Sequence, residues 1–349
     1  MELSLKLDSL VGGFAKNASI SELKIQVASV SSGLNYGWQS SESKATHLIA
    51  SGTKMFAATV IQQLAEAGKL SLSDSLAKHL PVSDYANLNL QNGVDCSDQI
   101  TVRDLLSHTS GIADYYALKR LPNKGDLAQI SAQDPGWSFE EAMALARTLP
   151  AKFPPNSGKA SYSFTNYQLV GRLIEAVTNQ PLGEVFRTKI FEPIELSQTS
   201  LITPENLSSF DDASQVLMGK QKYQGARRIA SLGAEGSIVS STEDTTRFLK
   251  SFFSGELISE AGRGSLLAAW LPIFPGIRYA AGVMSLGLPR FATRASHRGR
   301  YLGHSGATGH FMFYDPIEKL TIVGTINQLK PSILPYRIMA SVLRAINSA

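Results

Sequence analysis

Hydrophobic residues alternate with polar ones near both ends of the chain. Alternation runs from Lys24 to Val30 and from Leu34 to Gln39, with Ser31-Ser32-Gly33 between the two segments, so it predicts a β-hairpin. It returns later in the chain, where it predicts strands at 236–240, 301–304, 310–314 and 320–326.

The middle of the chain shows a helical period instead. From Ser51 onward, apolar side chains recur every three or four residues until Gly68, which predicts an amphipathic helix. Further helices are predicted within 1–20, 101–106, 170–177 and 338–346. We therefore expect an α/β (α+β) fold, in which 1–75 and 226–349 form a sheet domain and 76–225 form an inserted, mainly helical domain.

Composition narrows the class of protein. The 349 residues are 43% apolar and 18% charged, as in ordinary soluble domains. The net charge is +4 without a long Lys/Arg run, so we expect no nucleic-acid partner. Cys96 is the single cysteine, which excludes an intrachain disulfide, and no apolar run is long enough for a transmembrane helix.

The first residues lack the basic start and apolar core of a signal peptide. As the chain stands, this predicts a cytoplasmic protein; a periplasmic location would require a leader that is left out of the chain. The sequence does not define the oligomeric state.

Ser51 and Lys54 are the first candidates for chemistry. Three residues apart at a helix start, they share one helix face. A serine hydroxyl becomes a strong nucleophile when a base takes its proton, and a lysine can be that base if burial lowers its pKa. The free N–H groups of the helix start favour a developing oxyanion.

Three other stretches strengthen this hypothesis: 162–167 (YSFTNY), 303–307 (GHSGA) and 106–112 (LSHTSGI). In order and spacing, the motifs resemble those of the serine β-lactamases and penicillin-binding proteins, S-x-x-K, S-D-N and K-T-G. The most similar branch holds the class C β-lactamases, D-alanyl-D-alanine carboxypeptidases and class VIII esterases, with Tyr-x-Asn as second element and His-x-Gly as an accepted third. The resemblance extends from Ile49 to Asn327 and implies a β-lactamase-like fold, an antiparallel sheet flanked by helices.

The resemblance also implies roles for individual residues. Ser51 would be the acylated nucleophile, and Lys54 would be its proton acceptor or would hold the base ready. Tyr162 would be a second acid/base, provided that nearby cations lower its pKa. His304 would lie near Tyr162 and the leaving group, where other members carry lysine.

Backbone groups complete the site that the resemblance implies. The N–H groups of Ser51 and Ala307 would form the oxyanion hole, because such donors must be fixed before charge develops. Gly306 would let the substrate lie close against the strand.

Phe164 departs from the pattern, because it occupies the position of the asparagine in Tyr-x-Asn. A phenyl ring offers no donor or acceptor to a peptide-like substrate, and it would desolvate Lys54. We therefore expect a serine hydrolase that forms a Ser51 acyl-enzyme and acts mainly on esters. The alternatives are a carboxypeptidase or β-lactamase-type amidase, a site in which Asn166 replaces the missing amide, and a binding protein that has lost turnover.

Other functional readings have less support. His297, His304 and His310 lack nearby acidic or cysteine partners at zinc-site spacing, so we expect neither a metal nor another cofactor. His108 is expected to be structural.

The 303–307 segment approaches the nucleophile elbow of α/β-hydrolases, but the last glycine is missing and a strand pattern follows it. The expected partner is a small ester, peptide or β-lactam.

Overall fold

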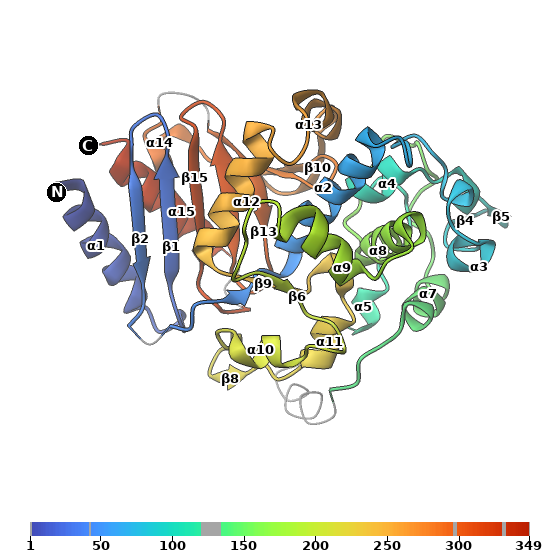
Figure 1. Cartoon of the computed structure of the whole chain (residues 1–349), viewed down its shortest axis with the longest axis horizontal. Coiled ribbons are helices and arrows are strands. Elements are labelled where there is room, and N and C mark those ends of the chain that lie inside the picture. Colours follow the sequence, from blue (N-terminus) through green and yellow to red (C-terminus); the bar gives the residue numbers. More distant parts are fainter. Residues whose placement is uncertain (1, 42, 120–133, 296–298, 330–332, 349) are drawn as a thin grey trace.

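An eight-stranded antiparallel sheet joins the two ends of the chain (Figure 1). The computed structural model describes residues 2–41, 43–119, 134–295, 299–329 and 333–348. The strand order is β10-β11-β12-β13-β14-β15-β1-β2. Their bounds are β1 Lys24–Ser29, β2 Asn35–Gln39, β10 Leu271–Phe274, β11 Ile277–Tyr279, β12 Met284–Gly287, β13 Arg300–Ser305, β14 Phe311–Asp315 and β15 Leu320–Thr325.

Helices cover both faces of the sheet, as Figure 1 shows. On one face, α1 (Glu2–Ala15) and α15 (Leu334–Ile346) pack against Val27 and Ile322. On the other face lies α12 (Thr242–Ser254). Because both faces are covered, every residue of β15 is buried, which is typical of a central strand.

The remaining helices and short strands lie mostly outside this sheet. The helices are α2 Thr53–Glu66, α3 Val82–Tyr85, α4 Val102–Ser107, α5 Tyr116–Lys119, α7 Phe139–Arg147, α8 Phe164–Thr178, α9 Leu182–Phe186, α10 Ser208–Asp212, α11 Ala226–Ala230, α13 Glu260–Leu266 and α14 Arg290–Thr293. The short strands are β3 His47–Leu48, β4 Leu90–Gln91, β5 Val94–Asp95, β6 Ser200–Leu201, β7 Leu217–Met218, β8 Gln221–Lys222 and β9 Ile238–Ser240.

The predicted fold class is confirmed, with differences in detail. The hairpin β1–β2 and the strands β13 to β15 form where alternation predicted them. The strand predicted at 236–240 is β9, but it belongs to a separate three-stranded sheet with β3 and β6. Strands β10 to β12 had no counterpart in the sequence prediction.

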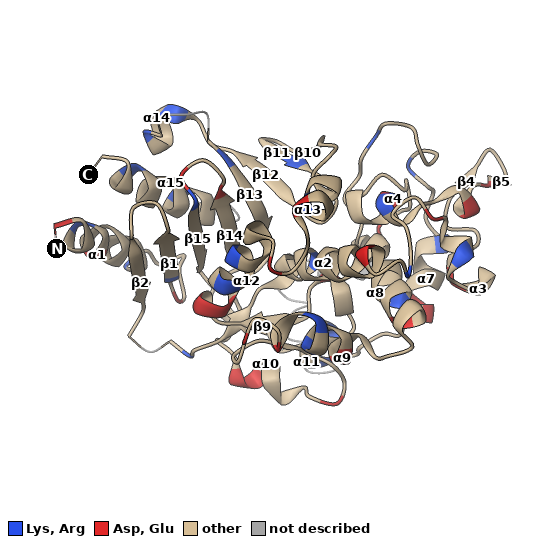
Figure 2. Cartoon of the chain, turned by 45° about the horizontal axis from the view of Figure 1, so that its top comes forward, with Lys and Arg blue, Asp and Glu red and all other residues tan. Residues whose placement is uncertain are grey.

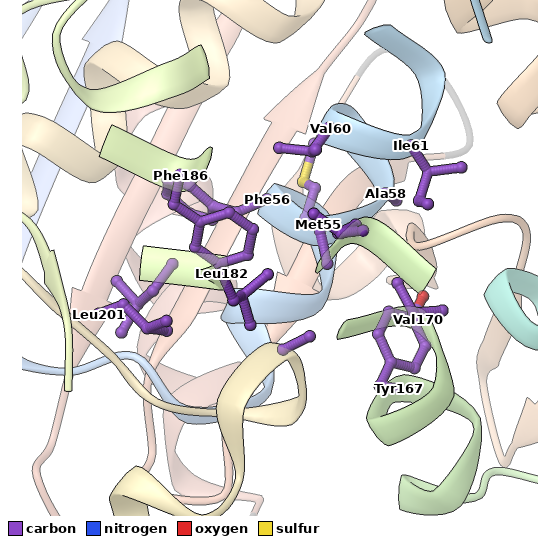
Figure 3. Close-up of a cluster of buried hydrophobic side chains, with 14 of the residues drawn as sticks. Met55, Phe56, Ala58, Val60, Ile61, Tyr167, Val170, Leu182, Phe186 and Leu201 are labelled. Atoms are coloured by element: carbon purple, nitrogen blue, oxygen red, sulfur yellow. The ribbon is translucent and has the colours of Figure 1, made fainter. Parts of the chain in front are cut away.

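Helix α2 is more buried than an amphipathic helix would be. Every residue from Thr53 to Gln62 is buried. Figure 3 shows Met55 and Phe56 among side chains that include Tyr167 and Phe186. A helix that is covered all round is a core element, so α2 holds its polar residues, Lys54 included, in the interior.

The division into domains at residues 75 and 225 stays a prediction. One hydrophobic cluster extends from α12 and α2 to α4 and α8, and so spans the predicted boundary. Figure 2 shows basic and acidic residues interspersed over the outer helices. Among the described residues, none of the helices combines the length and apolar character needed to cross a bilayer.

Phe248 of α12 offers a test of this core. Its ring stacks on that of Phe56, with centroids 3.6 Å apart, and is fully buried. We predict that Phe248→Ala lowers the free energy of unfolding by about 3–5 kcal/mol, because it loses apolar burial and leaves a cavity. Urea denaturation measures this. The control is Phe291→Ala, at an 80% exposed position, which should stay within about 0.5 kcal/mol of native. Equal effects of the two substitutions would contradict this packing.

Candidate active site

A tight turn presents Ser51 immediately before α2. Ala50, Ser51 and Gly52 form a 3₁₀ turn, η1, that leads into the helix. Ala50 has a φ of 47°, a left-handed conformation that costs a non-glycine residue about 1–3 kcal/mol. The surroundings hold the turn in place, since the Ile49 N–H donates to Ile238 O over 3.0 Å. The hydroxyl of Ser51 thereby lies at a fixed point beside Lys54.

Lys54 has the environment of a general base. Its side chain is fully buried, and Nζ lies 3.3 Å from Ser51 Oγ and 2.6 Å from the carbonyl oxygen of Glu235. Burial lowers the pKa of Lys54 to about 7, although Glu235 and Asp114 act in the opposite direction. Near neutral pH much of this lysine is therefore an amine, which can accept the Ser51 proton.

Aromatic rings form the shell around this amine. The Lys54 Nζ lies 4.4 Å from the centroid of the Phe164 ring, 5.2 Å from that of Tyr162 and 5.3 Å from that of Tyr167. Phe164 begins α8, and its ring stacks on Tyr116 with centroids 4.5 Å apart. The phenyl ring therefore faces the Lys54 amine, as a side chain that desolvates this amine must do.

Asn166 is engaged elsewhere and does not replace the missing amide. It is fully buried, accepts a hydrogen bond from Ser110 Oγ (2.6 Å) and lies 3.1 Å from His108 Nδ1. His108 is buried too, and its Nδ1 accepts from the Ser163 N–H. The side chains of Asn166 and His108 thus hold the first residues of α8 in place through hydrogen bonds.

Tyr162 is a phenol in this structure. Burial raises its pKa well above the ordinary value, and the Ser51 hydroxyl offsets only part of this rise. Its hydroxyl is buried, and within the described part of the chain no group lies in position to form a hydrogen bond of normal geometry with it. The condition for a phenolate, a pKa lowered by nearby cations, is therefore not met, because the effect of burial is larger. At neutral pH Tyr162 is a phenol, which can donate a proton.

His304 differs in charge from the lysine that other members carry at its position. It is fully buried, and burial lowers its pKa to about 3, so the imidazole is neutral at neutral pH. Its Nδ1 lies 2.8 Å from the Ser305 carbonyl oxygen and must donate to it, which leaves Nε2 to accept from the Tyr279 hydroxyl at 3.0 Å. The centroid of the Tyr279 ring lies 5.6 Å from that of His304 and 6.0 Å from that of Tyr162. His304 thus orients Tyr279 rather than supplying positive charge.

Gly306 and Ala307 follow β13 in a turn beside the serine. A Cβ on Gly306 would come 2.3 Å from the Ile49 carbonyl oxygen. The glycine therefore lets this turn approach the segment that carries Ser51. Its expected role in making room for substrate stays a prediction. Ala307 lines the same cavity as Ser51. The assignment of the Ser51 and Ala307 N–H groups to an oxyanion hole stays a prediction.

That cavity, which we call the Ser51 pocket, has a volume of about 100 Å³. Its described lining contains no Lys, Arg, Asp, Glu or His side chain and is mostly apolar. The lining residues are Leu48, Ala50, Ser51, Tyr116, Phe164, Val216, Tyr223, Ile229, Leu232, Gly236, Ala307, Thr308 and Leu329. Such a pocket accepts a small apolar group beside the nucleophile.

Sequence reasoning missed several residues that contact the site. Glu235 ends the 3₁₀ turn η5 (Gly233–Glu235) and is fully buried. Tyr279 lies on β11 and Asp114 in the loop before α5. None of them belongs to a recurring pattern, although Glu235 is a carboxylate within an otherwise small and apolar segment, Gly233-Ala234-Glu235-Gly236. Of the histidines considered as metal ligands, His297 lies outside the described residues.

The low pKa of Lys54 gives a testable pH dependence. Below about pH 7 the amine is protonated and cannot accept the Ser51 proton. We predict that the rate at which a fluorophosphonate probe labels Ser51 rises with pH to a plateau, with a midpoint near 7. Lys54→Met should abolish the rise, whereas Lys69→Met, at an exposed lysine, should leave it unchanged. A labelling rate that does not vary between pH 5 and 9 would contradict this assignment.

Comparison with known proteins agrees with this geometry. Residues 25–343 match the Beta-lactamase family. A protein from Escherichia coli (strain K12), described provisionally as a D-alanyl-D-alanine carboxypeptidase, is 25% identical over 315 residues, which cover 80% of this chain and 68% of the relative.

Two solved structures share the fold over nearly the whole chain. The D-amino acid amidase from Ochrobactrum anthropi SV3, complexed with D-phenylalanine, has a TM-score of 0.81 at 19% identity, covering 100% of this chain and 99% of its own. EstCE1, a hydrolase with promiscuous acyltransferase activity, has a TM-score of 0.76 at 17% identity, covering 98% of each chain. Together with the family match over most of the chain, these findings identify the protein as a serine hydrolase of the beta-lactamase family.

Proposed function

We propose that this hydrolase cleaves esters of small or medium acyl groups through an acyl-enzyme on Ser51. One observation carries the proposal. The ring of Phe164 covers the amine of Lys54 and lines the Ser51 pocket, at the position where the family pattern has an asparagine. The ring removes water from the base and leaves this side of the pocket apolar.

An apolar wall disfavours peptide-like substrates more than esters. The amide group beside a scissile peptide bond or a β-lactam needs polar partners, and one left unpaired on burial costs about 1–3 kcal/mol. A simple ester has no such group, and its alkoxide leaves more readily than an amine. The size of the pocket, about 100 Å³, favours acyl chains of modest length.

The geometry supports the following sequence of steps. The Ser51 proton moves to Lys54 Nζ as Oγ attacks the ester carbonyl carbon. The N–H groups of Ser51 and Ala307 receive the negative oxygen. Tyr162, a phenol at neutral pH, donates a proton to the departing alkoxide, after which Lys54 returns a proton to the phenolate. Water then attacks the acyl-enzyme, with the proton transfers reversed, and releases the acid and Ser51.

Amide hydrolysis is the second candidate, because the names of the Escherichia coli relative and of the Ochrobactrum structure point to it. A carboxypeptidase must also bind a terminal carboxylate, which proteins commonly do with Arg or Lys. The described lining of the Ser51 pocket has neither. This favours esters over peptides with a free carboxyl end.

Removal of the nucleophile tests the mechanism. We predict that Ser51→Ala lowers kcat for p-nitrophenyl butyrate by about 10⁴-fold or more, since the acyl-enzyme cannot form. The fold should persist, because no cap hydrogen bond from Ser51 is lost. Circular dichroism and the urea midpoint serve as controls for folding. Near-native turnover by this variant would exclude Ser51 as the nucleophile.

The role of Phe164 is tested by the ratio of ester to β-lactam hydrolysis. We predict that the native protein hydrolyses p-nitrophenyl butyrate with a kcat/KM far above that for nitrocefin. Phe164→Asn should lower this ratio by about fivefold or more, because it restores a polar contact worth about 1–3 kcal/mol. Phe291→Asn makes the same exchange at an exposed site and should leave the ratio unchanged.

Two results would overturn the proposed preference. One is a native protein that already prefers nitrocefin, and the other is a ratio that does not respond to Phe164→Asn. A panel of D-amino acid amides and D-alanyl peptides, run beside the esters, decides whether the second candidate replaces the first.

A further inference from the structure

We propose that the side chain of Glu235 is the buried countercharge of Lys54 and that it sets the pH at which this amine becomes able to accept the Ser51 proton. The inference rests on the proposed function for the roles of Ser51 and Lys54 and extends it to a positioning residue. Glu235 has no exposed surface, and its own backbone oxygen accepts a hydrogen bond from Lys54 Nζ at 2.6 Å. The carboxyl group therefore belongs to the residue that anchors the base.

A hydrogen-bonded network is built to hold this carboxyl group. The Tyr115 hydroxyl donates to Glu235 Oε2 over 3.2 Å. The same hydroxyl oxygen accepts from Trp137 Nε1 (3.0 Å) and from Gln168 Nε2 (3.2 Å). Because these two donors occupy its lone pairs, the only proton of Tyr115 is directed at Glu235.

The other carboxyl oxygen has the opposite environment. Glu235 Oε1 is buried and has no hydrogen-bond partner within the described residues. An ionised carboxylate in such a place requires a nearby positive charge, since burial alone strongly disfavours it. Burial raises the pKa of Glu235 well above its ordinary value, and the charge of Lys54 offsets part of this rise. Glu235 in turn raises the pKa of Lys54, against the larger effect of burial.

The tyrosine and histidine side chains around Lys54 are uncharged and do not compete with Glu235 as its countercharge. Tyr162 and Tyr167 from the α8 segment are neutral, because burial raises the pKa of each. His108, at the end of α4, and His304 on β13 are neutral as well, because burial lowers theirs.

Asp114 is the other acidic group that acts on Lys54, and it acts less strongly than Glu235. Its Oδ1 accepts from the backbone N–H groups of Tyr116 (3.2 Å) and Phe164 (3.1 Å). These donors stabilise its charge independently of Lys54. Glu235, which is held by one phenol and has an unpaired oxygen, is the carboxyl group whose protonation is coupled to that of Lys54.

Two protonation states of the pair follow. An ionised Glu235 stabilises the ammonium form of Lys54, which cannot act as a base. A protonated Glu235 removes this attraction, so the amine form dominates at a lower pH. The two residues then titrate as one coupled unit, and the observed midpoint belongs to the pair.

The test measures the pH dependence of Ser51 labelling by a fluorophosphonate probe. In this reaction the Ser51 oxygen forms a bond to phosphorus, fluoride leaves, and the Ser51 proton moves to Lys54. We expect Glu235→Gln to move the midpoint to lower pH by about one unit or more, because it removes a negative charge that favours the ammonium form of Lys54. The plateau rate at high pH should stay close to native, since Lys54 is already an amine there.

Two further variants control the result. Glu205→Gln, at an exposed carboxylate, should leave the midpoint unchanged. Tyr115→Phe removes the donor to Glu235, which favours the protonated carboxyl and should also lower the midpoint, by a smaller amount. This variant retains the test if Glu235→Gln does not fold, as judged by circular dichroism.

The outcomes separate this inference from the proposed function. A native protein that the probe does not label at Ser51 overturns the proposed function. Labelling with a midpoint that is the same in native protein and in a folded Glu235→Gln or Tyr115→Phe variant overturns the role of Glu235 alone. A lower plateau with an unmoved midpoint has the same meaning, because it reports a structural defect without charge coupling.

Discussion

Dehydration of the Lys54 amine is the constraint on which the site depends. A lysine in water is protonated at neutral pH and cannot activate a serine, but here burial lowers its pKa to about 7. The rings of Phe164, Tyr162 and Tyr167 exclude water from the amine, and the Glu235 carbonyl oxygen anchors it. The same burial explains why α2 must be a core helix rather than a surface one.

The fold supplies this environment from segments that are far apart in sequence. Helix α2 carries the base, α8 begins with Phe164, and η5 brings Glu235. The turn after β13 packs so closely on Ile49 that only glycine fits at Gly306. Segments of the sheet and of the helical part of the chain therefore meet at Ser51.

The sequence was sufficient to predict the elements that have strong periodic or motif signals. The β1–β2 hairpin, the strands β13 to β15 and the Ser51–Lys54 pair belong to this group. Strands β10 to β12 were not predicted because they are short. The first of them also contains Pro272, a residue that is unusual inside a strand. Glu235 and Tyr279 could not be placed, because only tertiary packing brings these isolated residues to the site. The protonation states of Tyr162 and His304 could not be predicted from the sequence either, because they depend on how deeply each side chain is buried.

The most direct test of the central claim is time-resolved mass spectrometry of the intact protein mixed with p-nitrophenyl butyrate. The account predicts that a butyryl group appears on the peptide that contains Ser51, that it persists while ester remains, and that it disappears when the ester is consumed. Acyl mass on another residue would contradict the assignment of the nucleophile. A butyryl group that never leaves Ser51 would show a binding protein without turnover.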